Sequence, residues 1–352
     1  MSRVRGADGT GAERVDRLHV TLFYRRPLPN YHSVERLFAD IEDAMPASID
    51  ARAAVSRFVS RGVLRRLYNL FEASRRQGDV NHITGDVHYL AYALRGGKTV
   101  LTVLDLVLVH RLRGWRRAVM LNLWYRWPVR RVACVTVISQ FTKDDLLQHV
   151  DVEPDKVHVI PPPVSPRFLP DPRPFGDPPR VLLVGTKPNK NLERVAEALE
   201  GLRCTVRIVG PLSAEQRAAL ERHRLVYSSD VGLSDDEMIR EYQQCDLLCF
   251  ASTFEGFGMP IAEAQAVGRP VVTSNVCSMP EVAGGAACLV DPFQVASIRA
   301  GLERVMSDAS YREELVRRGF ENARRFRPET IAARYAELYR RVARSGAQGG
   351  TA

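Results

Sequence analysis

Residues 247–270, LLCFASTFEGFGMPIAEAQAVGRP, form the most informative stretch of the chain. Their first four residues are apolar and predict a buried strand, and a loop with two glycines leads from this strand into a helix. Pro260 suits the first turn of that helix, Gly268 suits its C-terminal cap, and Pro270 prevents its continuation. A buried strand that leads through a glycine-rich loop into a helix is typical of an α/β protein with a parallel sheet.

The same alternation of strands and helices extends in both directions from this stretch. Proline and other turn-forming residues crowd residues 171–180, which predict an extended linker between two halves. Apolar runs that predict buried strands occupy residues 19–24, 99–103, 132–138, 181–184, 205–209, 247–250, 271–273 and 287–290. Helical patterns lie between them, for example over residues 191–199, 235–244 and 260–267. We therefore expect an α/β fold with two Rossmann-like, doubly wound parallel-sheet domains that face each other across a cleft.

Length and local composition give the expected boundaries of the domains. A chain of 352 residues suits two domains of ordinary size. We expect, in order, a flexible tail, an N-terminal Rossmann-like domain, a linker, a C-terminal Rossmann-like domain, a helix that crosses back to the N-terminal domain, and a second tail. Their expected bounds are 1–17, 18–170, 171–180, 181–328, 329–344 and 345–352.

Composition argues against several classes of protein. Hydrophobic residues make up 45% and charged residues 26% of the chain, which is typical of a folded soluble protein. No run approaches the roughly 18 apolar residues of a membrane-spanning helix, and the polar first seventeen residues do not resemble a secretory signal. The six cysteines have no C-x-x-C spacing, so neither a zinc site nor a disulfide framework is indicated. We expect a cytoplasmic protein without a metal site.

The loop before the helix at 260–267 has the features of an anion site. Gly256 and Gly258 allow the backbone to approach a ligand closely, and the first N–H groups of the helix point toward it. A diphosphate suits such a site. Glu255 and Glu263 lie at the same end of the helix, where carboxylates can accept hydrogen bonds from sugar and ribose hydroxyls. From these residues alone, a tight turn with a solvated glutamate remains the alternative.

Residues 254–263, FEGFGMPIAE, resemble the E-x7-E signature of retaining glycosyltransferases of family 4. Further segments similar to motifs of this family follow in the expected order at 81–89, 101–106, 137–143, 184–192, 271–275, 279–284 and 289–292. The resemblance implies the GT-B fold and a hexosyltransferase of class EC 2.4 that acts with retention and without a metal ion. It also implies a GDP-, UDP- or dTDP-sugar as donor, no further cofactor, and a glycan, lipid-linked or small-molecule acceptor.

Carried over by position, the resemblance assigns roles to individual residues. Glu255 would contact hydroxyls of the donor sugar, Glu263 would contact the ribose, and Lys190 would neutralise the departing diphosphate. The implied catalytic residues are Glu255, Lys190 and Asp105. The implied donor site comprises Gly185, Thr186, Lys187, Gly256, Phe257, Gly258, Met259 and Glu263. The implied acceptor side, in the N-terminal domain, comprises His82, Asp86 and His88.

One position in the N-terminal half departs from the family pattern. Members usually have a histidine before the aspartate of a T-x-H-D segment, whereas this chain has Leu104 before Asp105. A leucine cannot form a hydrogen bond with a sugar hydroxyl. A second hypothesis is therefore a degenerate, non-catalytic GT-B protein that binds a nucleotide sugar or a protein partner. The presence of Glu255, Glu263 and Lys190 argues against it, because a scaffold has no need for all three.

The excess of positive charge belongs to the first half of the chain. Residues 1–175 hold 27 basic and 18 acidic side chains, whereas residues 176–352 hold 23 of each. Two stretches, 56–71 and 111–131, combine arginines with apolar and aromatic residues, and the second contains all three tryptophans. One interpretation is peripheral contact with an anionic membrane surface at its inner face. The other is a pair of helices that pack on the core and expose a basic side to water. No motif supports binding of nucleic acid.

Overall fold

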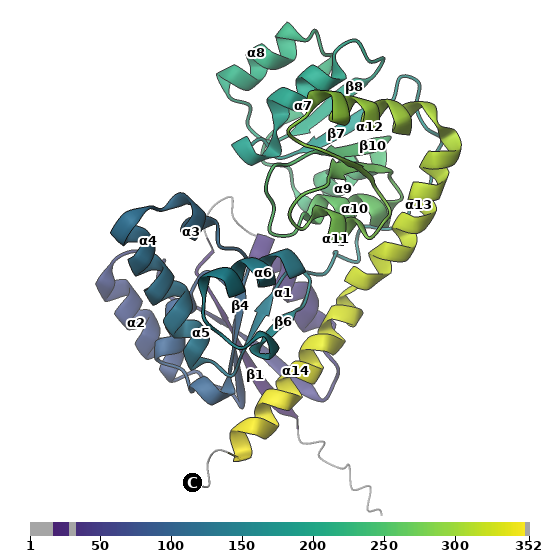
Figure 1. Ribbon diagram of the computed structural model, residues 1–352. Helices are drawn as coiled ribbons and strands as arrows, with labels where there is room; N and C mark the ends of the chain where they lie inside the picture. Colours follow the sequence, from purple (N-terminus) through teal and green to yellow (C-terminus); the bar gives the residue numbers. More distant parts are fainter. Residues whose placement is uncertain (1–16, 28–32, 349–352) are drawn as a thin grey trace, which may run out of the picture.

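The computed structural model describes residues 17–27 and 33–348, which form two α/β units (Figure 1). Each unit contains a six-stranded sheet in which all paired strands run parallel. The expected fold class, two doubly wound parallel sheets with flanking helices, is therefore confirmed. The expected N-terminal tail lies outside the described residues except for Arg17.

The N-terminal unit has the strand order β2-β1-β3-β4-β5-β6. Its strands are β1 (Leu18–Tyr24), β2 (Ile49–Val55), β3 (Val80–Ile83), β4 (Thr99–Val103), β5 (Cys134–Val137) and β6 (Val157–Val159). Its helices are α1 (Ser33–Asp43), α2 (Val63–Ser74), α3 (Val107–Arg111), α4 (Gly114–Met120), α5 (Trp127–Arg131) and α6 (Gln140–His149). Short 3-10 segments are η1 (His88–Tyr92), η2 (Gly96–Lys98) and η4 (Pro154–Lys156), and a π-helical segment, η3 (Leu121–Arg126), joins α4 to α5.

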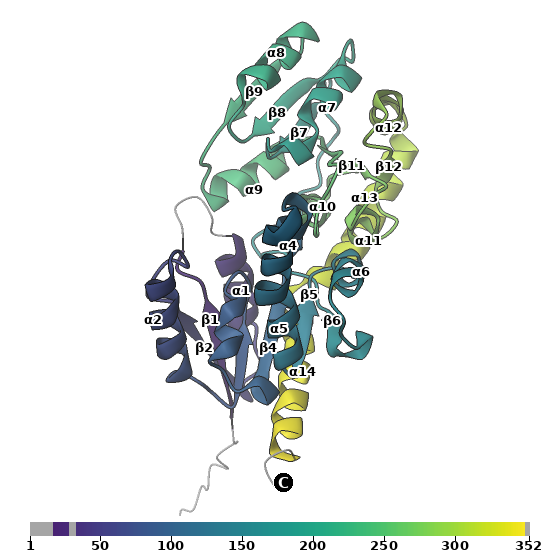
Figure 2. The same cartoon turned by 60° about the vertical axis from the view of Figure 1, so that its left-hand side comes forward.

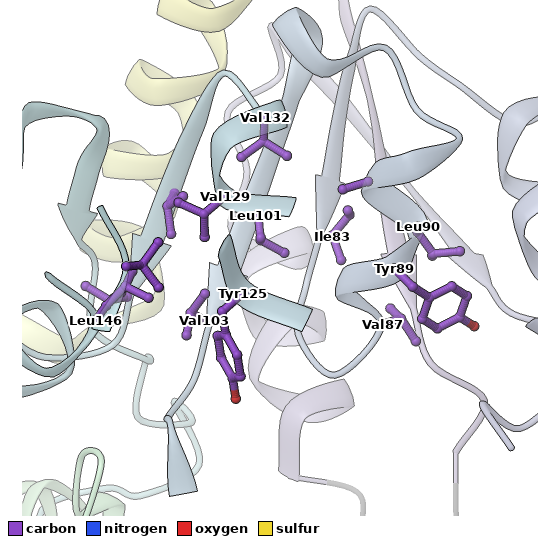
Figure 3. Close-up of a cluster of buried hydrophobic side chains, with 14 of the residues drawn as sticks. Ile83, Val87, Tyr89, Leu90, Leu101, Val103, Tyr125, Val129, Val132 and Leu146 are labelled. Atoms are coloured by element: carbon purple, nitrogen blue, oxygen red, sulfur yellow. The ribbon is translucent and has the colours of Figure 1, made fainter. Parts of the chain in front are cut away.

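Helices cover both faces of the N-terminal sheet. On one face, α2, η1, η3, α5 and α6 pack their apolar side chains on β1 and β3–β5. Figure 3 shows part of this layer, in which Tyr125 and Val129 lie over Leu101 and Val103. On the other face, α1 packs beside the C-terminal helix α14 (Pro328–Gln348). Burial on both faces explains why the central strands read as continuous apolar runs.

The C-terminal unit has the strand order β12-β11-β10-β7-β8-β9. Its strands are β7 (Arg180–Val184), β8 (Thr205–Val209), β9 (Tyr227–Asp230), β10 (Leu247–Phe250), β11 (Val271–Ser274) and β12 (Cys288–Val290). Its helices are α7 (Leu192–Leu199), α8 (Ala214–Arg222), α9 (Asp235–Gln244), α10 (Met259–Val267), α11 (Met279–Ala283), α12 (Val295–Ser307) and α13 (Ala309–Ala323), with η5 (Pro188–Lys190) and η6 (Arg324–Phe326). α10 begins after Gly258 and ends at Gly268, both in left-handed backbone conformation.

Two segments connect the units. Residues 171–179 contain no helix or strand. Hydrogen bonds hold them on the C-terminal unit: Arg269 donates to Asp171, and the amide of Gly176 donates to the carboxylate of Asp246. α14 returns from the C-terminal unit to the N-terminal one, as Figure 1 shows. Tyr335 and Tyr339 of this helix are buried against the N-terminal sheet. α14 extends to Gln348, beyond residue 344 where we expected a tail to begin.

Candidate active site

The two loops that carry the strongest sequence signal meet at the point where the C-terminal sheet reverses its strand order. β7 leads outward to β8 and β9, whereas β10 returns to the other side of β7. Parallel sheets bind ligands at such a point, beyond the carboxyl ends of the strands. The loops that follow β7 and β10 are tied together, because Asn191 Nδ2 donates to the carbonyl of Ala251 and the amide of Thr253 donates to the carbonyl of Asn189.

Lys190 and Glu255 form an ion pair across these two loops. Lys190 Nζ lies 2.7 Å from Glu255 Oε1, and both side chains are mostly shielded from solvent. Asn189 Nδ2 donates to the same carboxylate oxygen at 3.0 Å, and Lys190 Nζ lies 4.2 Å from the centroid of the Phe250 ring. The structure thus brings together two of the expected catalytic residues. Sequence reasoning did not single out Asn189, although it precedes Lys190 in the same motif-like segment.

The loop from Glu255 to Gly258 is held by hydrogen bonds from both units. Ser278 Oγ, which is buried, lies 2.9 Å from the carbonyl of Glu255 and 2.7 Å from that of Phe257. Ser139 Oγ of the N-terminal unit donates to the carbonyl of Gly256 at 2.6 Å. A Cβ atom at Gly256 would lie only 3.1 Å from the carbonyl oxygen of Leu104, so glycine permits this close approach of the two units.

The expected donor-side residues on α10 and just before it have different surroundings. Phe257 is buried in the core, where its ring packs edge-on against Phe326, so its side chain does not face the cleft. Met259 is the first residue of α10 and packs against the same core. Glu263 accepts a hydrogen bond from Tyr242 Oη at 2.6 Å, and its burial raises the pKa of its carboxyl group.

The loop after β7 contains the remaining expected donor residues. Gly185 has positive φ, and a Cβ atom there would lie 2.9 Å from Cε of Lys190, so a side chain at this position would displace the lysine. Thr186 Oγ1 donates to the carbonyl of Pro211, which ties this loop to the loop after β8. Lys187 is exposed and lines the cleft beside Lys190.

The N-terminal unit faces this site with carboxylates of its own. Its strand order reverses between β1 and β3. The loops after β1 and β3 meet there, and Arg25 of the first forms an ion pair with Asp86 of the second. Asp105 follows β4, and the amide of Val107 donates to its carboxylate at 3.1 Å. Surrounding protein, which displaces solvent, raises the pKa of the Asp105 carboxyl, and the nearby Asp86 carboxylate adds to this rise.

The two expected acceptor-side histidines differ in position. His88 Nδ1 lies 2.8 Å from the carbonyl of Trp124, and its ring lines the cleft although it is largely buried. The prediction for His82 is wrong. Its side chain is fully buried in β3, with Nδ1 2.7 Å from Tyr339 Oη and Nε2 2.7 Å from Thr102 Oγ1. It faces α14 because side chains alternate along a strand, and no local pattern reveals that a helix more than 240 residues later covers it.

A cavity of about 530 Å³ lies between the two walls. Several expected site residues line it together with residues that we did not single out. The lining residues are Asp86, His88, Leu104, Asp105, Val107, Leu108, His110, Arg111, Trp124, Tyr125, Lys187, Asn189, Lys190, Phe254, Glu255 and Gly256. Lysines thus lie on the C-terminal wall, and Asp86 and Asp105 lie on the N-terminal wall. Leu104, the departure from the family pattern, is part of the wall.

A histidine and carboxylate cluster at the edge of this cavity was missed from the sequence. His110 Nε2 lies 2.8 Å from Asp145 Oδ2, and His149 Nδ1 lies 2.8 Å from the carbonyl of Asp145. Among the described residues, these three form the one group of His, Cys, Asp and Glu side chains close enough to hold a metal ion. The i,i+4 spacing of Asp145 and His149 on α6 was the only local signal. The hydrogen bonds account for the cluster without an ion.

Comparisons with known proteins agree with this geometry. The model of the family described as Glycosyltransferase Family 4 matches residues 12–168, and that described as Glycosyl transferases group 1 matches residues 167–322. "O-antigen chain mannosyltransferase B" of Escherichia coli is 31% identical over 171 residues, which are 45% of each chain. "MMP alpha-(1->4)-mannosyltransferase" of Mycolicibacterium hassiacum is 28% identical over 65% of this chain and 60% of that protein. The chain therefore spans less than two thirds of the length of both relatives.

Solved structures support the same fold. Sucrose-phosphate synthase from Thermosynechococcus elongatus superposes with a TM-score of 0.74 at 16% identity, covering 93% of this chain and 99% of that one. Anabaena Alr3699/HepE in complex with UDP and glucose gives a TM-score of 0.72 at 16% identity, covering 91% and 99%. Both comparisons show the fold alone. The two family models together span nearly the whole described chain, and the chain belongs to the group 1 glycosyltransferases of family 4, with the GT-B fold.

Proposed function

We propose that this glycosyltransferase moves a hexose from a nucleoside-diphosphate donor to a saccharide acceptor with retention of configuration and without a metal ion. The observation that carries the proposal is the Lys190–Glu255 pair at the carboxyl ends of β7 and β10, beside the exposed Lys187. A carboxylate can accept hydrogen bonds from sugar hydroxyls. Two lysines can neutralise the negative charge that a diphosphate gains as it departs.

The donor would lie against the C-terminal wall of the cavity. Glu255 would accept hydrogen bonds from hydroxyls of the sugar, and Lys190 and Lys187 would neutralise the leaving diphosphate, a role that a divalent ion has in other enzymes. The N-terminal end of α10, where the helix dipole is positive, favours the same negative charge. GDP-, UDP- and dTDP-sugars are the candidate donors. Because both relatives described above are named mannosyltransferases, GDP-mannose is the first donor to test.

The acceptor would lie against the N-terminal wall. Asp86 and Asp105 lie on this wall, where carboxylates attract hydroxyl donors and repel phosphate groups. Trp124 adds an aromatic surface of the kind on which sugar rings pack. Arg111 lines the same wall, but the two carboxylates outnumber it there, so these groups together favour an uncharged saccharide end over a phosphorylated acceptor. We also propose that the protein works on the cytoplasmic side of a membrane, where its basic N-terminal unit meets anionic lipid.

The test of this function begins with nucleotide binding. Thermal unfolding would be followed with GDP, UDP, dTDP and ADP, each with and without magnesium. A ligand that binds only the native state adds about 2.7 kcal/mol to the free energy of unfolding at a hundredfold excess over its dissociation constant. We expect a clear shift with one nucleotide and the same shift without magnesium. Dependence on magnesium would contradict the metal-free mechanism.

Product analysis tests the remaining part of the proposal. The sugar linkage formed with a panel of saccharide acceptors would be assigned by NMR at the anomeric carbon, and retention is expected. Inversion would refute the proposed mechanism. Nucleotide binding without transfer to any acceptor would instead favour the non-catalytic binding protein, for which Leu104 on the cavity wall is the supporting observation.

A further inference from the structure

Helix α2 exposes an apolar stripe to solvent. Leu64, Leu67 and Phe71 follow one another at helical spacing and are all exposed, Leu64 to 83%. The helix is held on the sheet by the opposite side, where Ala73 is buried in the N-terminal core. The guanidinium of Arg75 lies 4.3 Å from the centroid of the Phe71 ring, but all three side chains remain exposed. An exposed apolar stripe of this kind is typical of an interaction surface.

The continuous helical segment 114–131, formed by α4, η3 and α5, carries a second stripe. Trp115, Val119, Leu123 and Trp127 recur every four residues and are all exposed, Trp115 to 72%. Buried residues of the same segment also recur every four residues, offset by two from the exposed set, and pack on the sheet. These buried residues are Leu121, Tyr125 and Val129. The segment is therefore apolar on two opposite sides, of which the sheet covers only one.

The two stripes belong to the same side of the molecule. α2 and the segment 114–131 pack on the same face of the N-terminal sheet, opposite the face that carries α1 and α14, and Figure 2 presents them toward the viewer. α2 and the segment 114–131 are also in contact, because the guanidinium of Arg66 on α2 lies 5.3 Å from the centroid of the Trp124 ring. We call these two helical faces, with the arginines between and beside them, the apolar–basic face.

Positive charge predominates on this face. Residues 106–131 contain seven arginines and no Asp or Glu. On α2 the carboxylate of Glu72 lies 3.5 Å from Arg76, whereas Arg65, Arg66 and Arg75 are further positive charges beside the stripe. Aromatic and aliphatic side chains flanked by arginine are complementary to the interface of a bilayer that contains anionic lipid.

This charge distribution argues against a second copy of the chain as the occupant. A symmetric dimer through this face would bring arginines against arginines without acidic partners. A membrane-spanning role is not indicated either, because no described helix is long and apolar enough to cross a bilayer.

We propose that the apolar–basic face docks on an anionic bilayer, with the stripes of α2 and segment 114–131 inserted at the level of the lipid headgroups. The same segment lines the active-site cavity with Trp124 and Tyr125, and the exposed Leu108 lies beside them on the cavity wall. Docking therefore holds the acceptor wall next to the lipid surface. The proposal rests on the proposed function, because it assumes sugar transfer in this cavity. It adds that the favoured acceptor is a saccharide anchored to lipid.

Vesicle flotation provides the first test. Wild-type protein would be mixed with vesicles of phosphatidylglycerol and phosphatidylcholine, and with vesicles of phosphatidylcholine alone. We expect binding to the first only, weakened when salt rises from about 0.1 M to about 1 M. The double variant Leu64→Gln, Trp115→Gln should have a partition coefficient at least about tenfold lower, because it removes two of the inserted side chains. The matched control is Val226→Gln, Phe293→Gln, which removes two exposed apolar side chains of the C-terminal unit and should bind like wild type.

Tryptophan fluorescence gives a second, positional test, because the chain has only three tryptophans and all lie in this segment. In single-tryptophan variants, brominated lipid in the same vesicles should quench Trp115 and Trp127. It should quench Trp124 much less, since Arg66 and Tyr89 cover this ring. Equal quenching of all three, or quenching of none, would overturn the proposed orientation.

Two further outcomes would also refute the proposal. One is equal binding of wild type to both kinds of vesicle. The other is a wild-type dimer in light scattering that the Leu64→Gln, Trp115→Gln variant loses, because the face would then be a protein interface. Nucleotide-induced thermal shift is measured on the same samples. A nucleotide-induced thermal shift without vesicle binding would refute only the docking of the apolar–basic face. Vesicle binding without any nucleotide-induced shift would refute only the proposed function.

Discussion

Both units place a cation and a carboxylate together at the point where the sheet reverses order, but the two pairs differ in their surroundings. In the C-terminal unit, Lys190 and Glu255 are each about four-fifths shielded, and Asn189 donates to the same carboxylate. In the N-terminal unit, Asp86 is half exposed although its partner Arg25 is largely buried.

The residues next to each pair extend this difference. Lys187 lies beside the C-terminal pair, whereas Asp105 lies on the wall beside the N-terminal pair. The C-terminal wall thus has a second lysine, whereas the N-terminal wall has a second carboxylate, with Arg111 also among its lining residues. The comparison teaches that parallel-sheet topology gives both units a candidate ligand site at the same kind of position, and that the neighbouring charges make the two walls different.

The largest expected effect follows from breaking the C-terminal pair. Glu255→Gln and Lys190→Ala should each lower kcat for sugar transfer by a factor on the order of 10²–10³, the loss typical of removing one group that stabilises developing charge. Steady-state kinetics with the identified donor and acceptor measure this. Glu193→Gln, an exposed glutamate on the first turn of α7, is the matched control and should retain wild-type activity. Near-wild-type turnover in either site variant would remove the assigned roles.

Asp105→Asn on the opposite wall should have a smaller and different effect. Loss of a charged acceptor for a sugar hydroxyl should raise KM for the acceptor about tenfold, because hydrogen bonds to charged groups contribute roughly 1.5–3 kcal/mol. The nucleotide-induced thermal shift should stay unchanged, since Asp105 lies on the N-terminal wall. The exposed Asp155→Asn serves as control. A change in nucleotide affinity with an unchanged acceptor KM would contradict the division between the two walls.

Local sequence signals were sufficient for most of the C-terminal unit. The bounds expected for β8, β10 and α9 match those observed, and Ser234 and Glu237 form the capping box that fixes the start of α9. The loop from Glu255 to Gly258 was found because consecutive residues carry its signal. Four strands were not among those expected, namely β2, β3 and β6 of the N-terminal unit and β9 of the C-terminal unit. Each of them includes polar or charged residues, so none reads as a continuous apolar run.

The features that sequence analysis missed depend on contacts between distant residues. Ser278 and Ser139 hold the carbonyls of the active-site loop from other elements, and no local pattern distinguishes them from other serines. The same is true of His110, which meets Asp145 of another helix. The mixture of arginines and apolar residues at 56–71 was evident from the sequence, but only the structure shows that Leu64 and Leu67 face solvent instead of the core. Periodicity identifies an amphipathic helix and leaves open what its apolar side contacts.

The smallest expected effect on activity concerns His82, whose substitution should change the stability of the N-terminal unit and leave acceptor binding unchanged. Burial lowers the pKa of His82 to about 3, whereas in the unfolded chain the imidazole titrates near its ordinary value of 6.5. The unfolded state therefore binds a proton that the folded state does not, and stability falls as pH decreases below 6.5. This residue alone should remove about 2 kcal/mol of the free energy of unfolding between pH 6.5 and about pH 5.

The variant His82→Gln tests this prediction, because its amide can still form a hydrogen bond with Tyr339 but does not titrate. The pH-dependent contribution to stability should disappear in this variant, and denaturant unfolding at the two pH values measures the difference. The acceptor KM should not change, because His82 faces α14; a raised KM with an unchanged pH dependence of stability would return His82 to the acceptor side.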